Sequence, residues 1–305
     1  MMSGILVVLV MQIGTAYFIL SERKGLGMFQ LRQGPNKASF KALGQPVADG
    51  VKLFLKQLSF PYGASLGGYL LGPLLLFFLA CLSWMAFPSV EGSVRLEWGM
   101  LYVLCVSSLH VFGVFICGYS CDSRYGMLGS MRGVAQAISY EVVMSGVVFC
   151  PLMLLGTLDL AQCRQCEVVN SLVAFETMIV WFIVMLAETN RTPFDFVEGE
   201  SELVAGYSVE YGGGGFAVIA LAEYGSMFFM SVLTSVIFFS GFSYPGSSHM
   251  VSNVWFSFVA VFFCFFFILV RGALPRFRYD LLMSFCWLWL LPLTLGFMTF
   301  YLCVG

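Results

Sequence analysis

Residues 188–210 read ETNRTPFDFVEGESELVAGYSVE, a stretch far more acidic than the rest of the chain. It holds six of the seventeen carboxylates in a protein of which only 10% of residues are charged. Thr192 before Pro193 predicts a helix start, because threonine caps helix N-termini and proline suits the first helical position. In such a helix Asp195, Glu198 and Glu202 would share one face and repel one another. Local stability does not favour this pattern, so the sequence predicts that the negative charge serves a function.

Outside this stretch the 305-residue chain is strongly apolar. It is 59% hydrophobic and 17% aromatic, with a mean hydropathy of +0.89, which is typical of a membrane protein. Helices satisfy their own backbone hydrogen bonds in lipid, so we expect an all-α polytopic protein forming a single membrane-embedded helical domain over residues 1–305. The net charge of −2 is uninformative about nucleic acid, but no basic run resembles a nucleic-acid-binding surface, so we expect no nucleic acid as a partner.

Uncharged intervals of about 20 residues predict the membrane spans. The sequence contains eight of them, at roughly 3–21, 66–90, 98–120, 133–156, 169–190, 214–240, 253–271 and 281–303. The loops on one side, 22–65, 121–132, 191–213 and 272–280, carry twelve of the fifteen basic residues, and Arg271 directly before the last loop is a thirteenth on the same side. By the positive-inside rule these loops lie inside and both chain ends lie outside.

The first inside loop contains a second predicted helix. From residue 44 to 58, Val47, Val51, Leu55 and Leu58 recur at helical spacing while Asp49 points elsewhere. This pattern favours an interfacial amphipathic helix on the bilayer surface over an ordinary surface helix of a soluble loop.

Two carboxylates fall well inside predicted spans. Glu141 and Glu223 lie about eight and nine residues into spans that leave the same face, hence at a depth of roughly 12–14 Å. Glu188 lies nearer that face and leads into the acidic stretch. Intramembrane ionisable residues are costly and therefore indicate function, here a proton-conducting or field-transmitting path. The structural alternative for Glu141 is a simple pair with one cation such as Arg132.

No set of metal or cofactor ligands is evident. Cys163 and Cys166 form a single C-x-x-C, whereas a structural zinc site needs four ligands. We therefore expect no metal and no redox cofactor bound by this chain, so redox input would come from a partner.

Six charged segments resemble subunit 1 of NADH:ubiquinone oxidoreductase, the respiratory complex I, in order and spacing. They are ERKGLGMFQLRQGPN at 22–36, QPVADGVKLFLK at 45–56, RGVAQAISYE at 132–141, AETNRTPFDFVEGESELVAGYSVEY at 187–211, AEYGSMFFM at 222–230 and PRFRYD at 275–280. The resemblance implies a membrane-arm subunit of a proton-translocating NADH:ubiquinone reductase. It also implies a role at the entrance and lower wall of the ubiquinone chamber.

Residue roles and partners follow from the same resemblance. The quinone cavity and its approach would be lined by Glu22, Arg23, Arg132, Asp195, Glu198 and Arg271. The acidic path toward the pumping subunits would contain Glu141, Glu188 and Glu223, with Glu200 and Glu202 before it. Implied partners are ubiquinone as substrate, the soluble-arm subunits with the quinone site and a terminal iron–sulfur cluster, the other membrane-arm subunits, and lipid.

The sequence departs from the family pattern at three places. Gln57 stands where glutamate is more usual, Leu281 replaces a usual glutamine, and Gly212 to Gly215 form a glycine-rich opening that would loosen the sixth span. The abundance of Phe and Met beside few Lys indicates a mitochondrial inner-membrane protein with its basic loops in the matrix. The alternatives are the membrane anchor of a related hydrogenase-type complex or a stand-alone proton or ion transporter, although no internal repeat supports the transporter.

Overall fold

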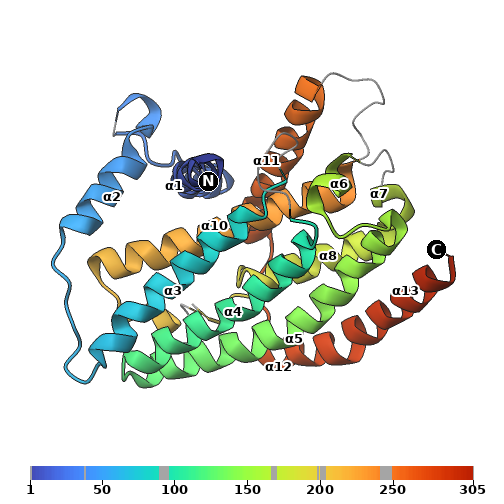
Figure 1. The fold of residues 1–305 in the computed structure, drawn as a ribbon. Coiled ribbons are helices and arrows are strands. Elements are labelled where there is room, and N and C mark those ends of the chain that lie inside the picture. The colour runs from blue at the N-terminus through green and yellow to red at the C-terminus, as the bar shows by residue number, and fades with distance from the viewer. Residues whose placement is uncertain are drawn as a thin grey trace.

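The computed structural model describes residues 2–37, 39–88, 96–165, 170–197, 199, 204–240 and 249–304. Within these ranges every regular element is a helix, as predicted (Figure 1). The elements are α1 (Met2–Phe29), η1 (Phe40–Ala42), α2 (Gln45–Leu55), α3 (Leu66–Met85), α4 (Gly99–Ser120), α5 (Arg124–Leu155), α6 (Leu160–Gln165), α7 (Asn170–Val173), α8 (Phe175–Glu188), η2 (Gly206–Ser208), α10 (Gly213–Phe239), α11 (His249–Ala273), α12 (Tyr279–Phe285), η4 (Cys286–Leu290) and α13 (Leu291–Val304).

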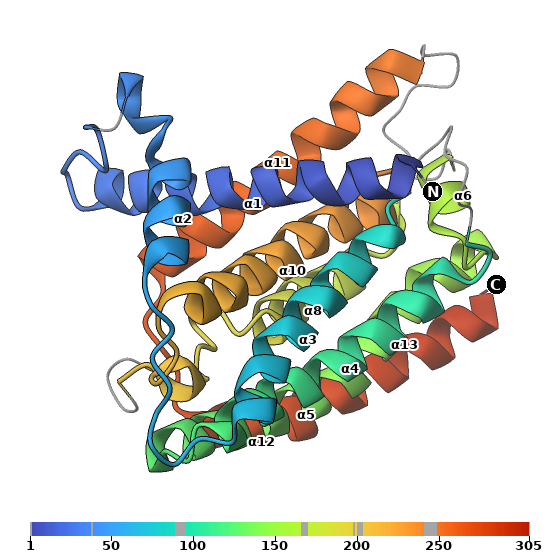
Figure 2. The same cartoon turned by 60° about the vertical axis from the view of Figure 1, so that its left-hand side comes forward.

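In the described ranges, seven helical segments are long and apolar enough to cross a membrane. They match seven of the eight predicted spans, and the last of them is continuous from α12 through the π-helical turn η4 into α13. The one predicted interval without such a helix is 169–190. It forms α7 and the 14-residue α8, with a break at Ala174 (φ −113°, ψ 43°). Both chain ends lie at one end of the bundle in Figure 2, as an even number of crossings requires.

Helix α10 is central to the packing. It contacts α3, α1, α11 and α2, and most of its second half is buried. The indole nitrogen of Trp84 on α3 donates to the carbonyl of Gly225 at 3.1 Å, which fixes these two helices against each other. Helix α10 thereby brings its own polar residues against α1, α8 and α11, where the candidate site lies.

Helix α2 confirms the predicted helix between residues 44 and 58. It runs crosswise to α1 in Figure 2, and Val47, Val51 and Leu55 are exposed along it. Its C-terminal end meets the start of α10 at Gly213, which has φ +57° and where an added Cβ would lie 3.4 Å from the carbonyl oxygens of Leu53 and Lys56. The space would admit a Cβ, but the left-handed φ favours glycine at this one of the four consecutive positions.

Helices α4 and α5 approach closely at Gly118, where a Cβ would lie 2.2 Å from Ser130 Oγ. We expect Gly118→Ala to lower stability by about 1–3 kcal/mol, because the two helices would have to separate. The yield of the protein from membranes and the midpoint of its thermal unfolding measure this effect. Gly67→Ala in α3, which has open space around it, is the matched control, and equal behaviour of the two variants would contradict the argument.

Candidate functional site

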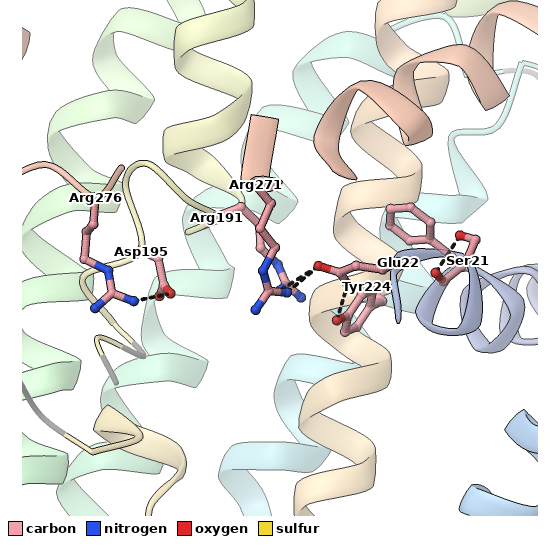
Figure 3. Close-up of polar contacts among 8 residues, drawn as sticks. Ser21, Glu22, Arg191, Asp195, Tyr224, Arg271 and Arg276 are labelled. Atoms are coloured by element: carbon pink, nitrogen blue, oxygen red, sulfur yellow. Dashed lines mark hydrogen bonds and ion pairs between the residues drawn. The ribbon is translucent and has the colours of Figure 1, made fainter. Parts of the chain in front are cut away.

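A buried cluster of charges surrounds Glu22, which lies in the last third of α1 and is 6% exposed. Its carboxylate accepts a hydrogen bond from Arg271 and one from the Tyr224 hydroxyl at 2.5 Å. Nη1 of Arg191 lies 3.8 Å from the same carboxylate, so both guanidinium groups point toward it (Figure 3). One anion thus faces two cations.

Four separate elements supply this cluster. Arg271 is in the last turn of α11, where a positive charge interacts favourably with the helix C-terminus. Tyr224 belongs to α10, and its ring packs edge-on against that of Phe18 of α1, with 5.7 Å between the ring centres. Arg191 follows the end of α8 and places its guanidinium 4.4 Å from the centre of the Tyr224 ring. The cluster therefore depends on the mutual packing of α1, α8, α10 and α11.

An apolar groove lies about one helical turn from this cluster, since Phe18, Phe228 and Ile268 in its lining are three or four residues from the cluster residues on α1, α10 and α11. It has a volume of about 220 Å³ and lies between α1, α10 and α11. Phe18, Phe228 and Ile268 contribute apolar walls, and Ser21 lines it directly before Glu22 in the chain. The groove can accept an elongated apolar group, and the neighbouring Glu22 cluster can bind a charged or hydrogen-bonding group attached to it.

A second ion pair lies beside the cluster, between Asp195 and Arg276 at 3.2 Å (Figure 3). The loop that carries Asp195 is held by Gln136 of α5. Its amide nitrogen donates to the carbonyl oxygens of Ala187 at 2.8 Å and Phe194 at 3.0 Å. This fully buried glutamine thus fixes the end of α8 and the following loop relative to α5.

The predicted helix start at Thr192 and Pro193 is wrong. Residues 191–197 form turns, in which the Phe194 amide donates to the Arg191 carbonyl at 2.8 Å. The Phe194 carbonyl bonds to Gln136 instead of to a following helical amide. A tertiary contact therefore overrides the local capping signal.

Glu223 precedes Tyr224 on α10 and has a different partner. The Tyr207 hydroxyl donates to its Oε1 at 2.5 Å, a charge-assisted type of hydrogen bond. Arg191 and Asp195 are both close enough to act on Glu223 electrostatically. Arg191 therefore acts on both Glu22 and Glu223, so a cation accompanies these two predicted site residues.

Glu188 and Glu141 form a further carboxylate pair. Glu188 ends α8, and Glu141 of α5 is close enough to interact with it electrostatically. Ser108 of α4 lies near Glu141, while its hydroxyl donates to the Cys105 carbonyl at 2.9 Å. The equal depth predicted for Glu141 and Glu223 does not make them partners, because Glu141 faces Glu188 and Ser108, whereas Glu223 faces Tyr207.

The remaining predicted site residues lie apart from Glu22 or outside the described ranges. Arg23 forms an ion pair with Asp49 of α2 at 2.7 Å, and more than half of its side chain is exposed. Arg132 is half-buried on α5, one turn before Gln136. Glu198, Glu200 and Glu202 lie outside the described residues, as does Cys166. Within the described ranges, no group of three or more His, Cys, Asp or Glu is placed to hold a metal ion.

Several residues at the site were not predicted. Tyr224, Arg191 and Arg276 contact the predicted carboxylates, and Tyr207 and Gln136 support them. The sequence does carry one usable signal, since Tyr224 follows Glu223 inside an otherwise apolar run. Nothing in the local pattern identifies Gln136, whose hydrogen bonds reach 51 and 58 residues along the chain.

Comparison with known proteins identifies the relatives of the chain. The family described as NADH dehydrogenase matches residues 2–302. The chain is 42% identical to NADH-ubiquinone oxidoreductase chain 1 of Aedes aegypti, over 99% of this chain and 95% of that protein. It is 43% identical to the protein of that name from Heterololigo bleekeri, over 98% and 95% of the two chains. For Pecten maximus the identity is 41%, over 97% and 85%. The chain therefore belongs to the NADH dehydrogenase family and, within it, to chain 1 of NADH-ubiquinone oxidoreductase.

Proposed function

We propose that this complex I subunit forms the entrance and lower wall of the ubiquinone chamber and links quinone reduction to proton translocation. The single observation that carries the proposal is the apolar groove between α1, α10 and α11, which lies about one helical turn from the buried Glu22 cluster. Ubiquinone has the matching chemistry, with a long isoprenoid tail and a head that accepts hydrogen bonds.

The groove suits the tail and the cluster suits the head. Apolar side chains from three helices would bind the isoprenoid units by removing them from water or lipid. At the inner end, Arg271 and Arg191 supply hydrogen-bond donors and positive charge, while Tyr224 supplies an additional hydroxyl group. A quinone head that gains electrons becomes more basic, so donors placed there would favour its reduction.

The carboxylates provide the link to proton movement. Arg191 acts on Glu22 and on Glu223, so a change of charge near the quinone head alters the field at Glu223. Two charges about 4 Å apart interact by about 4 kcal/mol near a protein surface, which is enough to drive protonation of a neighbour. Arg191 also follows Glu188 by three residues, and Glu188 interacts with Glu141. The path would run from Glu22 through Glu223 and Glu188 to Glu141, with Glu200 and Glu202 at the acidic stretch.

The remaining assignments belong to this proposal. Asp195, Arg132, Arg23 and Glu198 would lie on the approach to the quinone head. The electrons would come from an iron–sulfur cluster in an adjoining soluble-arm subunit, and the other membrane-arm subunits would receive the coupling signal. The chain would lie in the mitochondrial inner membrane with its basic loops in the matrix, where the soluble arm docks.

Quinone-reductase activity of the native membrane complex tests the proposal. Sealed vesicles would be assayed for NADH-dependent quinone reduction and proton uptake, each with and without a quinone-site inhibitor. We expect the inhibitor to stop both processes together. Quinone reduction without proton uptake in sealed, uncoupler-responsive vesicles would contradict the coupling role.

Replacing Arg271 tests the quinone side directly. We expect Arg271→Gln to raise the apparent KM for quinone about tenfold, because the groove end loses a charged hydrogen-bond donor. Glu22 keeps Arg191 and Tyr224 as partners, so the complex should still assemble. Arg278→Gln is the control, since Arg278 pairs with Asp280 at an exposed position. An unchanged KM in Arg271→Gln would remove Arg271 from the quinone site.

A further inference from the structure

A second cavity lies deeper in the bundle and contains a residue to which the proposed function gives no role. It has a volume of about 60 Å³ and lies between α3, α4, α8 and α10. Most of its lining is apolar, but His110 of α4 and Glu188 of α8 both line it. His110 is the one histidine whose side chain the structure describes, and it lies within an otherwise uncharged span.

Both titratable side chains have a buried polar atom that needs a partner. Nε2 of His110 and Oε2 of Glu188 are enclosed, and neither forms a hydrogen bond with any other described residue. Buried polar atoms in native proteins almost always have a partner, either a protein group or an ordered water. Two such atoms on the wall of one cavity indicate a shared ligand that donates and accepts hydrogen bonds.

The hydroxyl oxygens that line the cavity can each accept a further hydrogen bond. The hydroxyls of Ser83, Ser107 and Ser226 donate to backbone carbonyls of their own helices at 2.7, 2.9 and 2.7 Å. Thr189 does the same at 2.9 Å. Since each hydroxyl uses its only proton in this way, its oxygen remains available to accept from a ligand in the cavity.

The ligand that fits these conditions is water. A water needs roughly 10–15 Å³ of such volume and two to four polar partners, so a cavity of about 60 Å³ can hold several waters. We propose that this cavity holds an internal water cluster, and that His110 exchanges protons with Glu188 through it as an additional member of the carboxylate path. The proposal rests on the proposed function of that path.

The transfer is chemically balanced. The Glu188 carboxylic acid gives its proton to a water, which passes one of its own protons to Nε2 of His110. The products are a carboxylate and an imidazolium, and the water is regenerated. The total charge of the cavity is unchanged, so the step avoids placing an unpaired charge in the membrane. Glu141, which faces Glu188 from α5, is the other titratable group that acts on this pair.

Variants of His110 in the assembled complex test the proposal. His110→Gln keeps hydrogen-bonding groups for the waters but cannot carry a proton near neutral pH. We expect it to assemble, to lower inhibitor-sensitive quinone reduction and proton uptake about fivefold, and to remove one titrating group from the pH–rate profile. Cys105→Ser, on an exposed side of the same helix, should keep both rate and profile. Full turnover with an unchanged pH profile in His110→Gln would overturn the proposal.

A second variant tests the water cluster without changing the histidine. Val106 also lines the cavity, and Val106→Leu adds a methylene group that displaces water. We expect it to slow turnover by a similar factor, and an unaltered rate would contradict a role for the waters. Glu188→Gln, measured in the same assays, distinguishes a failure of this inference from a failure of the proposed carboxylate path. If Glu188→Gln impairs coupling while His110→Gln and Val106→Leu do not, only this inference fails. If Glu188→Gln leaves coupling unchanged, the carboxylate path itself fails.

Discussion

Glu188→Gln should abolish most proton-coupled quinone reduction while leaving the amount of assembled complex nearly unchanged. The side chain lies at the end of α8, with one carboxylate oxygen enclosed and Glu141 near it. Glutamine has almost the same shape but no exchangeable acid proton. We expect turnover and proton uptake to fall together by about tenfold or more, equivalent to at least about 1.4 kcal/mol of barrier.

Glu188→Gln should not lower the stability of the assembled complex, because it removes an ionisable group that is energetically costly in a membrane. An ionisable residue costs at least about 2.5 kcal/mol at the centre of a span on insertion scales and less near its end, where Glu188 lies, and neutral glutamine is less costly at either depth. The assembled yield on native gels therefore separates a chemical defect from a folding defect.

Glu176→Gln is the matched control for Glu188→Gln. Glu176 lies in the first turn of the same helix and is exposed, at the opposite end from Glu188. The same substitution there should leave turnover and proton uptake unchanged. If Glu188→Gln pumps at the full rate, or if both variants lose activity equally, Glu188 has no special place in the path.

The apolar pattern predicted the spans well because hydropathy and helix length are local properties. The interval 98–120 became α4 at Gly99–Ser120, and 214–240 became α10 at Gly213–Phe239. The pattern failed to locate the inner ends of α1 and α5. Helix α1 continues to Phe29 and α5 begins at Arg124, beyond the predicted apolar limits. Lysine, arginine and glutamate are good helix formers, so a helix can extend beyond the apolar layer.

The candidate site was only partly predictable, because its contacts depend on which faces of distant helices meet. Depth within a span identified Glu223 as unusual, whereas Glu22 and Arg271 were named only through the family resemblance. The ion pair between Glu22 and Arg271, however, joins residues 249 positions apart, and no local pattern specifies it. Adjacent residues of α10 also diverge, since Tyr224 faces Glu22 and Glu223 faces Tyr207. A sequence gives the depth of each residue in a span but not the rotation of the helix about its axis.

Removing Glu22 should have the largest effect on assembly of any single substitution at the site. Glu22→Leu leaves the guanidinium groups of Arg191 and Arg271 directed at a position without an anion. Breaking a buried ion pair from one side costs about 3–5 kcal/mol, because the remaining charge stays buried and unpaired. We expect the assembled complex to fall to a small fraction of the normal yield, measured by native gel and by the midpoint of thermal inactivation.

The two partners of this ion pair should not behave alike. Arg271→Gln leaves Glu22 with Arg191 and Tyr224, so it alters quinone binding without preventing assembly, whereas Glu22→Leu leaves two like charges together. Adding Arg271→Gln to Glu22→Leu removes one of these cations and should recover part of the lost yield, a non-additive result expected of residues in direct contact. Asp49→Asn, which breaks the exposed pair with Arg23, should change stability by no more than about 1 kcal/mol. If the double variant assembles no better than Glu22→Leu alone, the loss of the carboxylate partner of Arg271 is not the cause of the lower yield. The Glu22 carboxylate would then be required for another contact, such as its hydrogen bond from Tyr224.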